Sequence, residues 1–287
     1  MPRFSLIVAT IDRTNEFAVL LQSLAEQTTH NFELIVVDQN PDDRLSPLVE
    51  EWASKVAKQN KGESGYVQVK HIRCLPGVSR ARNLGLMHSG GEILAFPDDD
   101  CWYHPDTLQN VDAWFRRHED YGILSVGSRD EHGLVSGNRW VQSECDLTRI
   151  NAFRTSATYT YFVRRPKEVI PLHFDESLGP GAGTNFGAGE DTDLLLTLMS
   201  YGIRGRFYSA LHVGHPCRNG YVSVQRARKY GGGFGRVLAK HSLPFLCFGL
   251  VTFDFTRALL RLVFGDRSRA SQLWAHGQGM IQQYFSR

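Results

Sequence analysis

Three consecutive carboxylates, Asp98, Asp99 and Asp100, follow a short apolar run in this sequence of 287 residues. The run, Ile93–Phe96, is typical of a buried strand, and Pro97 ends it. Charges at the end of a buried strand cost free energy unless a counter-charge neutralises them. Mg²⁺ or Mn²⁺ would do so through carboxylate oxygens, whereas the simpler interpretation is a solvated loop that caps the next helix.

A second acidic pair, Glu190 and Asp191, lies where a glycine-rich stretch gives way to an apolar, helical pattern over Asp191–Tyr201. Carboxylates at a helix N-terminus are stabilised by the helix dipole and by free backbone N–H groups. Capping is therefore the simplest role, and it is the one we expect for Asp193. The glycines let the backbone approach a bulky ligand, so one acid of the pair could act in a cleft as a general base.

The first half of the chain predicts the frame that holds these clusters. Apolar, β-branched runs alternate with segments whose apolar residues recur every three or four positions. Strands are expected at Phe4–Thr10, Phe32–Val37, 67–72, Ile93–Phe96 and Gly122–Val126, and helices at 17–24, 45–56, Val78–Met87 and 108–115. This order predicts an α/β fold with a Rossmann-like, mostly parallel sheet and helices on both faces. In such sheets, ligands bind beyond the carboxyl ends of the strands.

The second half is less regular. Thr158–Val163 and Arg204–Tyr208 are strand-like, and the basic, glycine-rich stretch Arg226–Gly235 is typical of a mobile lid or of a turn between helices. Leu243–Phe253 is apolar but shorter than the about 20 residues that cross a bilayer. We expect a main domain over residues 1–241 and a helical tail over 242–287, which either lies on a membrane surface or packs on the domain.

The composition argues against several classes of protein. With 32 Lys and Arg against 30 Asp and Glu, the formal net charge is +2, which gives no reason to expect a nucleic acid partner. Five scattered cysteines without a CxxC pair favour a reducing compartment and argue against a zinc site or a disulfide framework. The apolar stretch at the N-terminus is too short for a secretory signal, so we expect a cytoplasmic protein.

Five stretches occur in the order and spacing of one enzyme family: FSLIVATIDR, FELIVVD, GVSRARNLGL, FPDDDCWYHPDTL and FGAGEDTDLLLTLMSYG. They cover about residues 4–202, and on them the chain resembles the family 2 glycosyltransferases, a large inverting group with the GT-A nucleotide-sugar fold. The resemblance implies an enzyme that moves a sugar from a nucleotide-diphosphate donor to an acceptor hydroxyl in one displacement. It also implies that the main domain, residues 1–241, is a GT-A domain.

The resemblance assigns roles to the acids. Asp100 matches the carboxylate that binds the metal, Mn²⁺ or Mg²⁺, which acts as a Lewis acid on the departing diphosphate. Asp98 is implied to face the ribose or base of the nucleotide. Asp191 matches the general base, preceded by Glu190, and takes a proton from the acceptor hydroxyl. No covalent enzyme intermediate is needed, so no activated Ser or Cys is expected.

The donor pocket is implied at the ends of the first two strands and in the acidic loop. The residues expected to bind the donor are Thr10, Asp12, Arg13, Asp38, Gln39, Arg82, Asp98 and Asp99. Many relatives have a second acid where this chain has Gln39, but an amide also donates and accepts at a pyrimidine edge. UDP or dTDP is therefore expected, and GDP stays open. Arg82, like Arg80, is suited to neutralise diphosphate, or else pairs with a surface acid.

The motif HVGHP contains two late histidines, His212 and His215. Some GT-A enzymes use a late histidine as an additional metal or phosphate ligand, and either of these two could do so. His215 is the candidate metal ligand here, because it precedes Pro216 at a plausible turn of the chain. A structural histidine in a loop is the alternative. The acceptor is expected to be a glycan or a lipid-linked precursor in surface polysaccharide biosynthesis, with the enzyme peripheral on the inner face of the plasma membrane.

Three other classes remain as alternatives. A nucleotidyltransferase would also use a Rossmann-like sheet, acids and a metal, but it would carry glycine after the first strand, where this chain has TIDRTN. A sugar-binding module without catalytic activity would not need both acidic clusters. A metal-dependent hydrolase more often shows histidine-rich ligand spacing.

Overall fold

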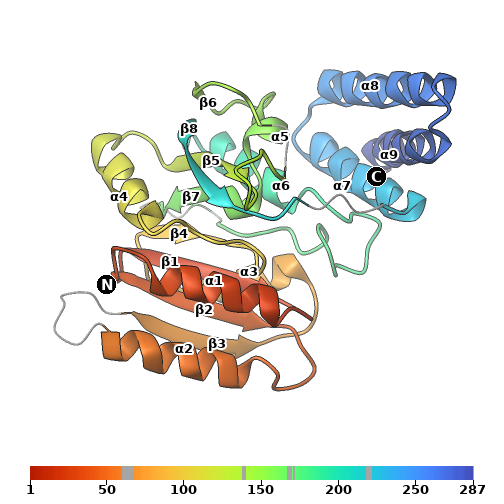
Figure 1. The fold of residues 1–287 in the computed structure, drawn as a ribbon. Helices are drawn as coiled ribbons and strands as arrows, with labels where there is room; N and C mark the ends of the chain where they lie inside the picture. Colours follow the sequence, from red (N-terminus) through yellow and green to blue (C-terminus); the bar gives the residue numbers. More distant parts are fainter. Residues whose placement is uncertain (60–66, 138–139, 167–169, 171, 218–221, 287) are drawn as a thin grey trace. The chain divides into compact units, whose positions relative to one another are not determined.

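Figure 1 presents the computed structural model, which describes residues 1–59, 67–137, 140–166, 170, 172–217 and 222–286. The chain forms two compact units. The first unit holds Met1–Pro76, Arg80–His173 and Leu198–Arg218, and the second holds Gly77–Ser79, Phe174–Thr197 and Asn219–Arg287. The expected boundary between residues 241 and 242 therefore lies inside the second unit.

Four parallel strands form one half of an eight-stranded sheet in the first unit: β1 (Phe4–Thr10), β2 (Phe32–Asp38), β3 (Gln68–Arg73) and β4 (Ile93–Ala95). β1, β2 and β4 are mostly apolar and buried, as expected for parallel strands that are covered on both faces. The register pairs the last residue of β1 with the last residue of β2, so their carboxyl ends coincide at one edge of the sheet.

Four helices accompany these strands: α1 (Asn15–Ala25), α2 (Ser46–Gln59), α3 (Val78–Met87) and α4 (Thr107–Arg117) (Figure 1). α1, α2 and α4 share one core with alternate strand residues. That core includes Leu6, Val8, Leu34, Val36, Phe17, Leu20, Val49, Trp52, Leu108 and Val111. α3 lies on the opposite face, where a Cβ added at Gly85 would come within 2.3 Å of Ile7. The predicted α/β fold with helices on both faces is confirmed.

The other half of the sheet is mixed. β7 (Tyr161–Arg164) lies antiparallel between β4 and β5 (Ile123–Arg129), and β8 (Gly205–Gly214) runs parallel to β5. β6 (Cys145–Asp146) forms the edge, which gives the strand order β3-β2-β1-β4-β7-β5-β8-β6. Four of these seven pairings are parallel.

The two strands predicted in the second half of the chain differ from the observed ones. The strand expected at Thr158–Val163 begins later, because Thr158–Thr160 form a short 3₁₀ helix, η1, just after the short helix α5 (Ala152–Thr155). The strand expected at Arg204–Tyr208 continues as β8 to Gly214, because its second part pairs with β5 beyond a register shift.

The second unit is helical. It contains the start of α6 (Glu190–Ser200) together with α7 (Val224–Lys240), α8 (Pro244–Val263) and α9 (Arg267–Phe285). Helices α7 to α9 are blue in Figure 1. Among the helices that the structure describes, none combines the length and apolar character needed to cross a membrane.

The glycine-rich basic stretch lies inside α7, so its prediction as a lid or a turn is wrong. Cβ atoms added at Gly231 and Gly235 would lie 1.9 and 2.1 Å from carbonyl oxygens of α9, and one at Gly233 would lie 1.9 Å from the carbonyl oxygen of Ala188. The glycines therefore allow backbones to approach closely. Each interior glycine costs a helix about 1 kcal/mol relative to alanine, and close helix packing offsets that cost.

Candidate functional site

The acidic loop that follows β4 is largely buried. Asp99 and Asp100 are each 6% exposed, and Asp98 is half-buried. Arg13, from the loop after β1, places one terminal nitrogen, Nη1, 2.5 Å from Asp99 Oδ1 and 3.0 Å from Asp100 Oδ2. β1 and β4 are neighbours in the sheet, so their carboxyl ends bring this cation and these acids together.

A second arginine, Arg82, forms an ion pair with the same loop. Arg82, in α3, is 4% exposed and donates from Nη2 to Asp98 Oδ1 at 2.9 Å. Burial raises the pKa of Asp99 to about 6, the Arg13 cation opposes the rise, and the like charges of Asp98 and Asp100 add to it. The raised pKa shows that the burial of Asp99 outweighs the attraction of the Arg13 cation.

His215 follows β8 and faces the acidic loop. Trp102 and Gly214 exchange two backbone hydrogen bonds, of 3.0 and 2.8 Å, which tie the loop to the end of β8. The His215 ring stacks on Tyr159 with 4.5 Å between ring centroids, and its backbone N–H donates to Arg129. These contacts fix the ring with Nε2 3.8 Å from Asp100 Oδ1.

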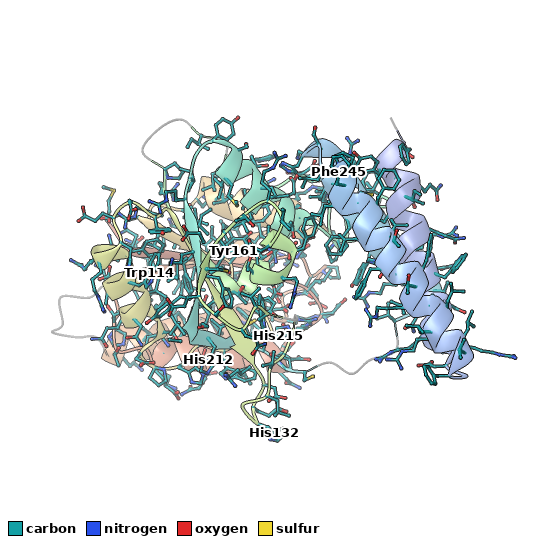
Figure 2. The ribbon with its side chains drawn as sticks, turned by 90° about the horizontal axis from the view of Figure 1, so that it is seen from above. Trp114, His132, Tyr161, His212, His215 and Phe245 are labelled. Carbon is teal, nitrogen blue, oxygen red and sulfur yellow. The ribbon has the colours of Figure 1, made fainter. Side chains whose placement is uncertain are left out.

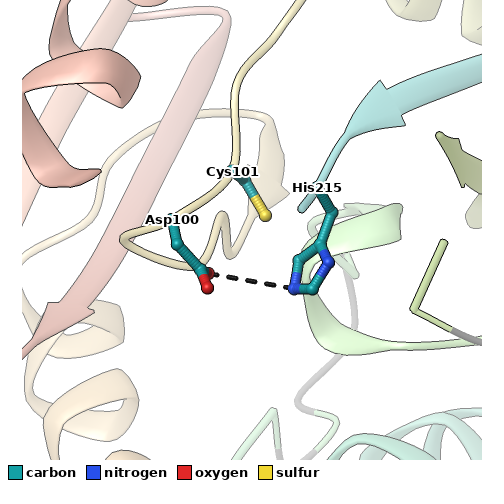
Figure 3. A group of neighbouring side chains, drawn as sticks. All are labelled: Asp100, Cys101 and His215. Atoms are coloured by element: carbon teal, nitrogen blue, oxygen red, sulfur yellow. Dashed lines mark ion pairs between the residues drawn. The ribbon is translucent and has the colours of Figure 1, made fainter. Parts of the chain in front are cut away.

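Figure 3 shows Asp100, Cys101 and His215 around one point. Their candidate ligand atoms, one from each residue, all lie within 4.8 Å of one another. His215 Nδ1 is buried and has no hydrogen-bond partner among the described residues, so its ring is not committed to a structural hydrogen-bond network. A carboxylate oxygen and an imidazole nitrogen suit Mn²⁺, so these residues fit a divalent cation.

Cys101 and Tyr159 are the parts of this arrangement that sequence reasoning missed. Cys101 is fully buried, and burial raises the pKa of its thiol well above the ordinary value. A lone cysteine beside an acidic cluster gives no ligand spacing to read, and stacking between residues distant in sequence leaves no pattern in the sequence. His212 lies within β8 and packs edge-on against His104 rather than facing the acids (Figure 2 labels both late histidines).

The other donor residues expected from the sequence lie at the carboxyl ends of β1 and β2. Thr10 is buried, and its carbonyl accepts from the backbone N–H of Gln39 at 3.0 Å. Asp38 is fully buried and accepts from the backbone and side chain of Asn40 at 2.8 and 2.7 Å. Asp12 is largely exposed and has a positive φ of 59°, a strained conformation that occurs at ligand sites.

The second acidic cluster belongs to the second unit. Glu190 and Asp191 form the first turn of α6, both half-buried, and Asp191 Oδ1 accepts from the backbone N–H of Thr192 at 2.7 Å. The left-handed glycine at Gly179 lets the preceding loop approach Glu190, since an added Cβ there would lie 2.9 Å from the Glu190 carboxylate. The prediction that Asp191 is the base stays a prediction.

Asp193 does not cap the helix as expected. Asp193 is 1% exposed. Its carboxylate accepts a hydrogen bond from Lys240 Nζ at 2.8 Å, and its other oxygen lies 2.8 Å from His241 Nε2. Both partners come from the end of α7 and the residue after it, which the sequence pattern could not place beside α6. Asp193 therefore connects two helices within the second unit.

Sequence comparisons relate this chain to known proteins. The family model described as "Glycosyl transferase family 2" matches residues 5–170. Poly(ribitol-phosphate) beta-N-acetylglucosaminyltransferase TarS from Staphylococcus aureus is 30% identical over 243 residues, which cover 78% of this chain and 38% of TarS. An uncharacterized glycosyltransferase from Haemophilus influenzae is 33% identical over 107 residues, 37% of this chain and 32% of that protein. The chain thus spans well under half the length of these relatives.

Solved structures share the fold. Residues 1–349 of S. aureus TarS in complex with UDP-GlcNAc match with a TM-score of 0.56 and 17% identity, over 99% of this chain and 93% of that one. The mannosyltransferase PcManGT from Pyrobaculum calidifontis, in complex with GDP-Man and Mn²⁺, matches with a TM-score of 0.60 and 17% identity, over 98% and 87%. At such identities the likeness concerns the GT-A fold, whereas the family match covers more than half of the sequence. The chain belongs to the family 2 glycosyltransferases.

Proposed function

We propose that this glycosyltransferase is metal-dependent and inverting, and that it moves a sugar from a nucleoside-diphosphate donor to a hydroxyl of a glycan or lipid-linked acceptor. The observation that carries the proposal is the placement of His215 Nε2 3.8 Å from Asp100 Oδ1, beside two further acids at the carboxyl ends of parallel strands. An acidic site with a raised Asp99 pKa is suited to attract a cation.

In the first unit, some of these residues would bind the cation and others would bind the sugar donor. Asp100 and His215 would hold Mn²⁺ or Mg²⁺, with the Cys101 sulfur close by as a further donor atom. The bound cation would supply charge neutralisation at the departing diphosphate. Arg13 and Arg82 would contact the donor phosphates once the cation takes over the carboxylates with which they pair. Asp98 and Asp99 would position the ribose side of the donor.

The remaining donor contacts would come from the strand ends. Thr10, Asp12, Asp38 and Gln39 would line the nucleotide pocket. Among them, the Asp38 carboxylate is held by Asn40, so that its orientation is fixed before the donor binds. UDP or dTDP is the expected nucleotide, and TarS, whose solved complex contains UDP-GlcNAc, favours UDP. The complex of PcManGT with GDP-Man keeps GDP among the donors to test.

Asp191 would act as the general base, with Glu190 beside it at the start of α6. Its carboxylate would take the proton from the acceptor hydroxyl as that oxygen bonds to the anomeric carbon. The bond from the anomeric carbon to the diphosphate oxygen would break in the same displacement, which inverts the configuration. The position of Asp191 in the family motif and its incomplete burial support this role.

A relative and the chemistry of lipid-linked acceptors support a proposal for the acceptor and the place of action. The relative TarS is named for transfer onto poly(ribitol-phosphate), which favours a role in surface polysaccharide biosynthesis. We propose that the protein works at the cytoplasmic face of a membrane, as a peripheral rather than a spanning protein, because lipid-linked acceptors lie there.

A thermal-shift screen tests the proposal. UDP, dTDP, GDP and CDP would each be added with and without Mn²⁺. We expect one diphosphate to raise the melting temperature only with Mn²⁺, because a ligand that binds only the folded state stabilises it by about 2.7 kcal/mol at a hundredfold excess over its Kd. Equal shifts with and without Mn²⁺ would contradict metal dependence.

Two alanine variants locate the site. Asp100→Ala should abolish the Mn²⁺-dependent shift, because it removes the carboxylate nearest His215. The matched control is Glu119→Ala, which removes an exposed carboxylate of the same unit and should leave the shift unchanged. A wild-type shift in Asp100→Ala would move the cation elsewhere.

A further inference from the structure

The outward face of α8 is apolar. Phe245 is 91% exposed and Val263 is 79% exposed, and between them Phe248, Phe253 and Leu260 are each about half exposed. Figure 2 labels Phe245 in the first turn of the helix. Soluble helices normally turn charged or polar residues to water, so this helix has the reverse pattern on its free side.

The helical period separates this face sharply from the packed one. Cys247, Val251, Asp254 and Ala258 are buried and recur every three or four residues, which places them on the side that packs on the rest of the unit. Asp254 is the one carboxylate in α8, and it pairs there with His276 Nδ1 at 2.6 Å. The exposed face therefore carries no negative charge.

Cations lie beside the C-terminal half of this face. Arg257 lies over the Phe253 ring at 5.2 Å from its centroid, and Arg261, Arg267 and Arg269 are exposed around the end of α8 and the start of α9. Residues 222–287 contain ten Lys and Arg against two Asp and no Glu, whereas the rest of the chain contains 22 Lys and Arg against 28 Asp and Glu. The positive charge of the chain is thus concentrated in the segment that bears the apolar face.

We propose that α8 is an in-plane docking helix for an anionic lipid surface. Its phenylalanine and leucine side chains would enter the boundary between headgroups and acyl chains, and the arginines would contact the anionic headgroups. A second copy of the chain is disfavoured as the occupant, because two such faces would bring two strongly cationic segments together. The inference rests on the proposed membrane location but not on the transfer reaction.

The test is co-sedimentation of the full chain with vesicles, without donor or acceptor. One set contains phosphatidylcholine alone, and the other contains phosphatidylcholine mixed with phosphatidylglycerol. We expect at least tenfold stronger binding to the anionic vesicles, and weaker binding as salt is raised, because the headgroup contacts are screened.

Paired variants show whether α8 is responsible. Phe245→Asp with Val263→Asp should weaken binding to anionic vesicles at least tenfold, whereas the control pair Val19→Asp with Met87→Asp changes two exposed apolar residues of the first unit and should not. Circular dichroism and melting temperature should match wild type in both, since all four side chains are exposed. Arg257→Gln with Arg267→Gln should reduce the preference for anionic over neutral vesicles.

Three results would overturn the proposal. They are absence of wild-type binding to anionic vesicles, unchanged binding of the α8 variant, and a dimer in sedimentation velocity that the α8 variant dissociates. The last would assign the face to a second copy of the chain. A nucleotide-dependent thermal shift in a protein that ignores vesicles would leave the proposed transferase function intact while excluding the lipid surface.

Discussion

Both units of this protein bury aspartates, but they compensate the charge differently. In the second unit, Asp193 lies 2.8 Å from Lys240 and 2.8 Å from His241, so one carboxylate meets two potential cations. In the first unit, the three acids of the loop after β4 share Arg13 and Arg82 among the contacts described. Burial raises the pKa of Asp99 to about 6 even with Arg13 beside it.

The pKa shifts of Lys240 and of Asp175, which pairs with Lys240, support the same distinction. Burial alone would lower the pKa of Lys240, yet hydrogen bonds and charge from Asp193 and Asp175 raise it. Burial would likewise raise the pKa of Asp175, but hydrogen bonds from Ser177 and Lys240 outweigh it and lower the pKa. A buried acid that pairs with a lysine and a histidine of the same unit holds the fold together, whereas a cluster of three adjacent acids beside a histidine is suited to bind an external cation.

The largest effect is expected at Asp191, which shares α6 with Asp193. Asp191→Asn should lower turnover about 10²–10⁴-fold, because an amide cannot accept the acceptor proton. Affinity for the nucleotide, measured by calorimetry with Mn²⁺, should stay at the wild-type value. Near-normal turnover would remove the role of Asp191 as base and with it the functional contrast between the two acids of this helix.

A smaller effect, on stability alone, is expected at Asp193. Asp193→Asn should lower the free energy of unfolding by about 1–3 kcal/mol, because it weakens the contacts with Lys240 and His241. The lower part of this range is favoured by the partial exposure of Lys240. Urea unfolding measures the change, and the Mn²⁺-dependent nucleotide affinity of the folded variant should be unaltered. A selective loss of nucleotide affinity would show that Asp193 also serves the site.

The smallest effect concerns pH. The pKa of Asp99 is about 6 in the folded protein and near 4 when unfolded, so the folded state holds its proton more tightly. Without metal, stability should therefore fall as pH rises from about 4 to 6, by at most about 3 kcal/mol. Asp99→Asn should lose this part of the pH dependence in urea unfolding with a chelator present. Asp175, whose pKa is lowered, contributes in the opposite direction and only as pH falls below about 4.

Much of the first unit could be predicted from the sequence. β1 is found at the predicted residues, and β2 and β4 lie within one residue of them, because runs of buried apolar residues are visible without tertiary information. The acidic cluster was also visible, because three carboxylates after a buried strand conflict with local burial unless they have a function. Helix α3 likewise has the predicted bounds.

Other features could not be predicted from the sequence, because they depend on contacts between residues that are distant in the chain. The sequence pattern predicted a lid or a turn at Gly231–Gly235, because four of these five residues are glycines, which disfavour helices. Close packing against α9 and Ala188 instead accommodates them within α7. The Asp193 contacts with Lys240 and His241 depend on helix packing in the same way. No local propensity records which backbone will pack closely against a given glycine.

By itself, the sequence determined the order of strands and helices in the first half of the chain, the acidic loop and the glycosyltransferase family, because periodicity and motif spacing are local properties. Only the tertiary structure decided how the His215 ring is held toward Asp100, since the bridge from Trp102 to Gly214 and the stacking on Tyr159 fix it. It also decided which side of α8 is left exposed, because burial depends on which neighbours a helix meets in the folded chain.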